Sequence, residues 1–221
     1  MRNHVLIALI ACILIAGIGA YVAVKPSVTG NAAVVTGVYV TGTSIPYTCV
    51  LNLTIGWNLI SQICYVDNST LAEILSPINS SYDSVISYDP DEVPRWNTNK
   101  KDLPPWVFQN LTQISTKRGY WINITSNATL TVNGSIVTLI EISLAKGYNL
   151  VSYPVNRTNT VTDAFSSIWP AVISVETYNS TTKTYEIYDK RDPGNATLNY
   201  VSSGRGYWVN TTQDTTWVLV I

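Results

Sequence analysis

The chain contains one sequence pattern twice, and this internal repeat limits what it can fold into. Gly56–Ser61 (GWNLIS) returns about 90 residues later as Gly147–Ser152 (GYNLVS), and Arg118–Asn123 (RGYWIN) returns as Arg205–Asn210 (RGYWVN). Two further matches lie between these in the same order. A period of this length indicates one structural unit per copy. The predicted divisions are a leader or anchor at 1–26, an extension at 27–50, repeat 1 at 51–134 and repeat 2 at 140–221.

Each copy shows the same order of local patterns. A β-prone run opens the copy, and a short amphipathic segment follows it. In repeat 1 this segment begins with Thr70-x-x-Glu73, which is typical of a helix capping box, and Pro77 limits its length. Further β-prone runs complete the copy. We therefore predict a mainly β (α+β) fold of two small barrel-like or sandwich-like repeats, each with one short helix, after an N-terminal transmembrane helix.

The N-terminal segment favours an external location for both repeats. Val5–Val24 carries no charge and, at 1.5 Å per residue, is long enough to cross the hydrocarbon core of a bilayer. Arg2 precedes it, which favours a cytoplasmic N-terminus and an external C-terminal region. Two alternatives stay open: a single-pass cell-membrane anchor, and a signal peptide that is cleaved so that the protein is secreted.

Asn-X-Ser/Thr sequons are far more frequent than chance would give, and an external location would expose them to N-glycosylation. Where they fall in β-prone runs, alternation places the asparagine opposite the apolar residues. The predicted glycosylation sites are Asn52, Asn68, Asn79, Asn110, Asn123, Asn127, Asn133, Asn156, Asn179, Asn195 and Asn210.

Cysteine and histidine content narrows the chemistry. Cys49 and Cys64 would form a short-loop disulfide in an oxidising compartment; the alternative is a pair of buried thiols. The one histidine is His4, which argues against histidine-dependent catalysis and against histidine-ligated zinc. With 13 basic and 14 acidic residues, the chain lacks the basic character that nucleic-acid binding needs. No spacing of the carboxylates singles out a hydrolytic pair. We expect no enzymatic activity and no cofactor.

The repeat resembles a tandem domain of archaeal and bacterial extracellular, S-layer-associated surface proteins. The matching pieces are Gly56–Ser61, Val85–Asp89, the stretch from Trp96 to Trp106, Arg118–Ile122 and Thr129–Val132. Repeat 2 departs from the pattern at Tyr148 and Asn179, and its proline-rich stretch is shorter. The resemblance implies a cell-surface role and implies no activity.

Three local features suggest ligands or partners. Asp89, Asp91 and Glu92 form a weak candidate calcium site, for which a solvated turn is the alternative. Trp96, Trp106 and Trp121 could form a carbohydrate platform, for which core packing is the alternative. The β-prone segment 32–41 could act as a donor strand that completes the sheet of a neighbouring subunit, or it could pair within its own chain.

Strand alternation also predicts which aromatic residues are interior. Trp121 and Trp208 share a strand face with the sequon residues Asn123 and Asn210, so we expect both indole rings to be partly buried, under a glycan or under a loop. Their neighbours on the opposite face should be interior: Tyr120, Ile122, Tyr207 and Val209.

The main expectation is a non-enzymatic, N-glycosylated cell-surface protein with a structural or adhesive role. Its partners would be the membrane, through the N-terminal helix, and itself, other surface proteins or glycans. The alternatives are an extracellular filament subunit that assembles by donor-strand exchange and a carbohydrate-binding module.

Overall fold

The computed structural model describes residues 22–24, 27–29, 32–34, 38–40, 45–62, 64–66, 70–104, 106–136 and 139–220. The chain divides into two units between residues 43 and 44. The expected membrane segment Val5–Val24 lies outside the described residues, except for its last three, which form strand β1. No helix among the described residues is long and apolar enough to cross a membrane.

The described residues of the first unit form four short strands in two antiparallel pairs. Strand β1 (Val22–Val24) pairs with β4 (Val38–Val40), and β2 (Ser27–Thr29) pairs with β3 (Ala32–Val34). The described parts of the segment 32–41, expected as a donor strand, therefore pair here with residues of their own unit.

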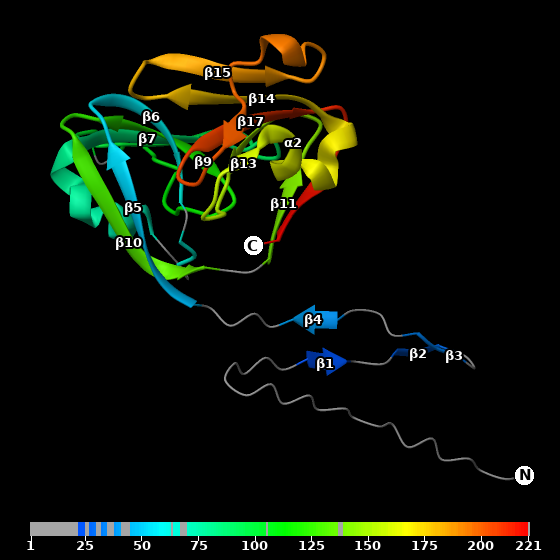
Figure 1. Cartoon of the computed structure of the whole chain (residues 1–221). Helices are drawn as coiled ribbons and strands as arrows, with labels where there is room; N and C mark the ends of the chain where they lie inside the picture. The colour runs from blue at the N-terminus through cyan, green and yellow to red at the C-terminus, as the bar shows by residue number, and fades with distance from the viewer. Residues whose placement is uncertain are drawn as a thin grey trace, which may run out of the picture. The chain divides into compact units, whose positions relative to one another are not determined.

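The second unit contains both repeats and is mainly β, as predicted. Each repeat has one four-stranded antiparallel sheet and one two-stranded ribbon, and repeat 2 has a further short pair of strands (Asn159–Thr160 with Tyr200–Val201). No sheet among the described residues closes into a barrel, so the architecture is sandwich-like. In repeat 1 the sheet order is β6-β9-β7-β8 and the ribbon is β5–β10; in repeat 2 the sheet order is β12-β17-β14-β15 and the ribbon is β11–β18 (Figure 1).

The strand and helix boundaries follow the same order in the two repeats. Repeat 1 consists of β5 (Ile45–Leu53), β6 (Gly56–Ser61), α1 (Leu71–Ile74), the 3₁₀ helix η1 (Ser76–Ser81), β7 (Tyr82–Tyr88), β8 (Trp96–Lys100), β9 (Gly119–Ile124) and β10 (Ala128–Ile136). Repeat 2 consists of β11 (Leu139–Leu144), β12 (Gly147–Ser152), β13 (Asn159–Thr160), α2 (Val161–Ala164), η2 (Ser166–Ala171), β14 (Val172–Asn179), β15 (Thr184–Asp189), η3 (Pro193–Asn195), β16 (Tyr200–Val201), β17 (Gly206–Thr211) and β18 (Thr215–Val220). Strand β5 begins at Ile45, so it crosses the expected boundary between extension and repeat.

The short helices form where the capping pattern predicts them. The Thr70 side chain accepts a hydrogen bond from the Glu73 backbone N–H, and the Glu73 carboxylate accepts one from the Thr70 backbone N–H, which satisfies two amide donors at the start of α1. The α-helical part is a single turn, after which the chain continues as 3₁₀ helix η1 because Pro77 removes a backbone donor. The buried face of the segment is the predicted one: Leu71, Ile74, Leu75 and Ile78.

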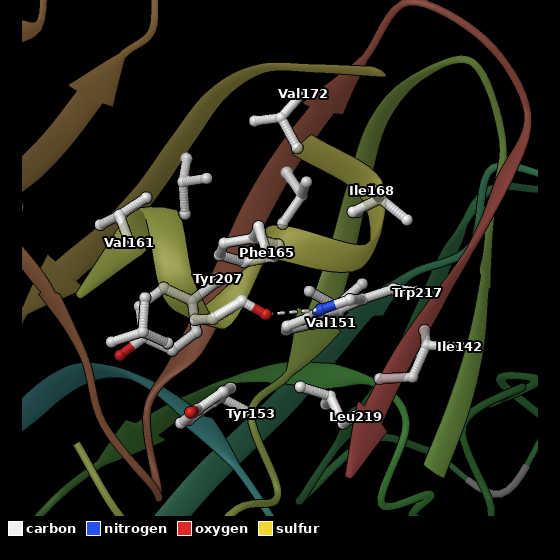
Figure 2. Close-up of a cluster of buried hydrophobic side chains, with 14 of the residues drawn as sticks. Ile142, Val151, Tyr153, Val161, Phe165, Ile168, Val172, Tyr207, Trp217 and Leu219 are labelled. Atoms are coloured by element: carbon white, nitrogen blue, oxygen red, sulfur yellow. Dashed lines mark hydrogen bonds between the residues drawn. The ribbon is translucent and has the colours of Figure 1, made fainter. Parts of the chain in front are cut away.

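Each repeat encloses its own apolar core between sheet, ribbon and helix. In repeat 2 the Phe165 ring stacks on Trp217 with ring centroids 4.3 Å apart, and the Trp217 Nε1–H donates to the Ala164 carbonyl at 2.8 Å (Figure 2). Trp217 is fully buried, and this hydrogen bond removes the cost of burying its polar N–H. Because the two cores consist of separate sets of residues, each repeat has an apolar centre of its own.

A buried asparagine holds the turn between the first two strands of each repeat. Asn58 Oδ1 accepts from the Thr54 N–H at 3.1 Å, and its Nδ2 donates to the Thr54 and Gly56 carbonyls at 2.7 and 2.9 Å. Asn149 makes the same set of bonds to Ala145 and Gly147 in repeat 2. Gly56 has a φ of 90°, a conformation that residues with a side chain rarely adopt. These bonds explain why the repeated motif contains Gly-x-Asn.

Candidate functional site

The two repeats meet along a seam that has approximate two-fold symmetry. An isolated β-bridge joins Ile60 of repeat 1 to Arg205 of repeat 2, and its counterpart joins Arg118 to Val151. The Ser61 N–H donates to the Gly204 carbonyl at 3.0 Å, and the equivalent Ser152 N–H donates to the Lys117 carbonyl at 3.2 Å. Because each contact occurs twice with the repeats exchanged, the same surface of each repeat is used, as in an isologous dimer.

Glycine in the Arg-Gly-Tyr-Trp motif is required by this seam. A Cβ atom placed on Gly119 would lie 2.9 Å from the Val151 carbonyl oxygen, and one on Gly206 would lie 2.8 Å from the Ile60 carbonyl oxygen. Each would also meet a leucine side chain of the opposite repeat at about 3.0 Å, Leu150 or Leu59. The motif glycines therefore permit the close approach of the two sheets.

The arginines of the same motif form ion pairs with carboxylates of their own repeat. Arg118 pairs with Asp89 and lies 3.6 Å from Glu92, while Arg205 Nη2 lies 2.7 Å from Glu186 Oε2. Burial of Glu186 acts in the opposite direction, but hydrogen bonds from Asn179 and Arg205 hold the pKa of its carboxyl below the ordinary value. Arg118 thus holds the turn after β7, and Arg205 holds strand β15.

Trp121 and Trp208 are partly buried, as strand alternation predicts, and the residues on the opposite face are interior. The expectation of what covers the indole rings was incomplete, because aromatic rings of the other repeat cover them. Trp121 packs against Tyr178 and Tyr185, with ring centroids 5.2 and 6.3 Å apart. Trp208 packs in the equivalent way against Tyr88 and Trp96, at 5.2 and 5.9 Å.

An open aromatic groove of about 540 Å³ lies between the repeat 1 sheet and Tyr185 of repeat 2. It contains two of the three tryptophans proposed as a carbohydrate platform, Trp96 and Trp121. Its rings meet edge to face rather than side by side, with 86° between the Trp57 and Trp121 planes. Trp106 lies in the loop after β8 and is 83% exposed. The residues that line the groove are Trp57, Ile86, Trp96, Thr98, Trp121 and Tyr185.

The acidic residues proposed for calcium make other contacts. Asp89 binds Arg118 and accepts a hydrogen bond from the Asp91 N–H at 3.1 Å, which closes a turn. Glu92 accepts from Asn97 Nδ2 at 2.6 Å. Within the part of the chain that the structure describes, no group of three or more His, Cys, Asp or Glu side chains is placed to hold a metal ion.

The sequon asparagines lie at the surface wherever the structure describes them. Asn68 is outside the described residues, and none of the other ten is buried. Six are exposed: Asn52, Asn79, Asn127, Asn133, Asn156 and Asn195. Four are half-buried: Asn110, Asn123, Asn179 and Asn210.

Cys49 and Cys64 form a disulfide, the pair named from the sequence. The bond joins the middle of β5 to the segment after β6, and both sulfur-bearing residues are buried in the repeat 1 core. It encloses a loop with a sequence separation of 15 residues. The disulfide therefore fixes ribbon β5–β10 to the four-stranded sheet of its own repeat.

Several seam residues were not singled out from the sequence, above all Leu59 and Leu150. A signal for them was present in the sequence. Both faces of β6 and β12 carry apolar side chains, whereas a strand with one exposed face would alternate apolar and polar residues. The fold and the seam define the second unit as a pair of sandwich-like β repeats that are related by an approximate two-fold axis. The chain matches no protein-family model, no curated protein and no solved structure.

Proposed function

We propose that the chain is a non-enzymatic, N-glycosylated cell-surface protein with a structural or adhesive role. The observation that best supports this proposal is that aromatic side chains pack across the seam between the repeats, while the arginines beside the seam pair with carboxylates of their own repeat. The Arg118 and Arg205 ion pairs and the Trp121 and Trp208 ring clusters flank the seam, so they serve assembly within the chain. The unburied sequon asparagines and the resemblance of the repeat to surface-protein domains support an external location.

Three of the carboxylates have structural partners within the fold, which supports a role other than catalysis. Glu73 completes the capping box of α1, Glu186 binds Arg205 and Asn179, and Asp89 binds Arg118. A general acid or base needs a proton to exchange with substrate. Side chains held in such contacts act instead as fixed charges that stabilise loops and helix ends.

The filament alternative is supported less well, because one edge strand of each four-stranded sheet, β8 or β15, is capped in part by side chains of the loop that follows it. Along β8, the Thr98 N–H donates to Asn110 Oδ1 at 2.8 Å, and the Lys100 N–H donates to Gln109. Along β15, the Ile187 N–H donates to Thr197 Oγ1 at 2.9 Å. An incoming donor strand would have to displace these caps.

The carbohydrate-binding alternative requires exposed rings that lie in one plane, so that the sugar can stack on them. The edge-to-face rings of the aromatic groove do not form such a platform. We therefore favour the structural and adhesive role over saccharide binding.

Limited proteolysis of intact cells that make the protein tests its location. Protease added outside should release peptides from residues beyond Lys25 without lysis, at loops such as the exposed one around Trp106. Peptides that appear only after lysis would overturn the proposal. A cytoplasmic protein measured in the same samples controls for leakage.

A further inference from the structure

The sequon asparagines differ in what their amide nitrogen does in the fold. N-glycosylation joins the anomeric carbon of a sugar to Asn Nδ2; the nitrogen loses one proton and the sugar leaves the lipid phosphate that carried it. An Nδ2 that donates both protons within the fold cannot be modified without losing a hydrogen bond. The contacts of each asparagine therefore indicate which sequons the folded protein can present.

Three exposed sequons gather on one ribbon of repeat 1. Asn52 and Asn133 lie on the outer face of ribbon β5–β10, and Asn127 immediately precedes β10. Their hydrogen bonds go through Oδ1, which accepts from Thr129 Oγ1 at 3.1 Å, from Thr48 Oγ1 at 2.9 Å and from the Ile55 N–H at 2.8 Å respectively. These contacts orient the amide group without using its nitrogen.

Asn110 is used in the opposite way. Its Nδ2 donates to Asn97 Oδ1 and to the Trp96 carbonyl at 3.4 Å, and its Oδ1 accepts from the Thr98 N–H. The side chain is half-buried and caps the edge of β8. A sugar on this nitrogen would break at least one of these two Nδ2 hydrogen bonds and so disturb the cap.

Asn179 differs from Asn110 in that its Nδ2 donates one hydrogen bond rather than two, but its side chain is also half-buried and its amide group is held through both the oxygen and the nitrogen. Its Nδ2 donates to Glu186 Oε1 at 2.9 Å, and its Oδ1 accepts from the N–H groups of Thr181 and Thr182 at 3.0 and 3.2 Å. The half-buried side chain thus holds the turn between β14 and β15 and helps to position Glu186 for Arg205.

We propose that ribbon β5–β10 carries a cluster of N-linked glycans at Asn52, Asn127 and Asn133, whereas Asn110 and Asn179 stay unmodified as structural asparagines. This inference rests on the proposed cell-surface function. The equivalent ribbon of repeat 2, β11–β18, contains no sequon, so the glycan cluster coats only one of the two ribbons.

Glycopeptide mass spectrometry of the protein from its native cells tests the proposal site by site. Sugar should be present at Asn52, Asn127 and Asn133 in most copies and absent from Asn110 and Asn179. Sugar at Asn110 or Asn179 would overturn the inference, as would bare ribbon sites together with modified Asn79 or Asn195; the proposed function would survive either result. A chain without sugar at any asparagine would overturn both.

Variants that destroy a sequon but keep its asparagine separate modification from structure. Ser135→Ala keeps Asn133 and should remove one glycan mass. Thr112→Ala keeps Asn110 and should leave the attached glycan mass unchanged. Asn110→Gln should also leave the attached glycan mass unchanged but should make the protein unfold at a lower urea concentration. A loss of glycan mass in Thr112→Ala would contradict the assignment of Asn110 even if Asn110→Gln failed to fold.

Discussion

At the scale of single residues, Asn58 and Asn149 show why a polar side chain is conserved between the two copies of the repeat. Each is buried, and each supplies hydrogen bonds to backbone groups of a tight turn that the turn itself cannot satisfy. Buried backbone groups without partners are costly. The turn geometry and the asparagine therefore depend on each other.

We predict that Asn58→Ala lowers the free energy of unfolding by about 1–3 kcal/mol, because it leaves Thr54 and Gly56 backbone groups without partners. Urea denaturation followed by tryptophan fluorescence measures the change. Asn199→Ala, at an exposed position, is the matched control and should lie within about 0.5 kcal/mol of the unaltered protein. Equal effects of the two substitutions would contradict the role given to Asn58.

The buried tyrosines predict a dependence of stability on pH. Burial raises the pKa of the Tyr120 hydroxyl to about 12, and it also raises the pKa of Tyr207. The ordinary pKa is about 10. Between these values the folded state keeps a proton that the unfolded state has lost. Stability is therefore fully present below pH 10 and should decline as the pH rises toward 12.

Urea midpoints measured at pH 9 and at pH 11.5 test this dependence. The midpoint should fall with pH in the unaltered protein, and it should fall less in Tyr120→Phe. That variant starts from a lower midpoint because it loses the bond to the Ser115 N–H. An unchanged slope in Tyr120→Phe would show that other groups cause the decline; Tyr200→Phe, which alters an exposed ring, is the control.

Much at this scale could be predicted from the sequence. Strand alternation correctly separates Tyr120 and Ile122 from Trp121, because the side-chain period of a strand is two wherever one face is buried. It cannot say what covers the second face. Trp121 was assigned to a glycan or a loop, whereas rings of the other repeat cover it, and contacts between distant segments leave no trace in local periodicity.

At the scale of elements, strands β9 and β17 form the seam through their first residues. Gly119→Ala should weaken the contact between repeats, because the added Cβ meets backbone rather than a flexible side chain. We expect a loss of about 1–3 kcal/mol, typical of overpacking, and faster proteolysis. Gly194→Ala adds the same atom in open space and should change stability little. The role of Gly119 would be refuted if Gly119→Ala were as stable as Gly194→Ala.

The disulfide is the covalent link between ribbon and sheet in repeat 1. Replacing both Cys49 and Cys64 by alanine should lower stability by about 2–4 kcal/mol, as expected for a short enclosed loop. Because repeat 2 has a separate core, hydrogen exchange should rise mainly in β5, β6 and β10. Uniformly faster exchange in both repeats would instead show that the two cores unfold as one unit.

Elements were predictable where a local signal marks them. The capping box and apolar spacing located α1, and the repeat located its counterpart α2. The start of β5 at Ile45 was not predicted, because the expected first repeat begins at residue 51, shortly before the first motif that the two copies share. The side-chain caps on β8 and β15 were also missed, since an asparagine or a threonine that bonds to a strand edge looks like any other loop residue.

At the scale of the whole molecule, the internal sequence repeat predicted two repeats of the same fold but not how they are arranged relative to each other. Paired contacts around Gly119 and Gly206 place the repeats about an approximate two-fold axis, and Trp121 and Trp208 pack there against aromatic rings of the opposite repeat. The sequon asparagines that the structure describes are all exposed or half-buried, so they lie at the surface of the repeats. The proposed function requires that the chain is an external glycoprotein.

The intact mass of the protein purified from its native cells tests this claim most directly, because one spectrum reports both glycan load and N-terminal cleavage. The account predicts a mass that exceeds the bare polypeptide by several glycans, with a ladder of species that differ by whole glycans. A single species at the mass of the bare chain, either complete or shortened only within residues 1–26, would contradict it.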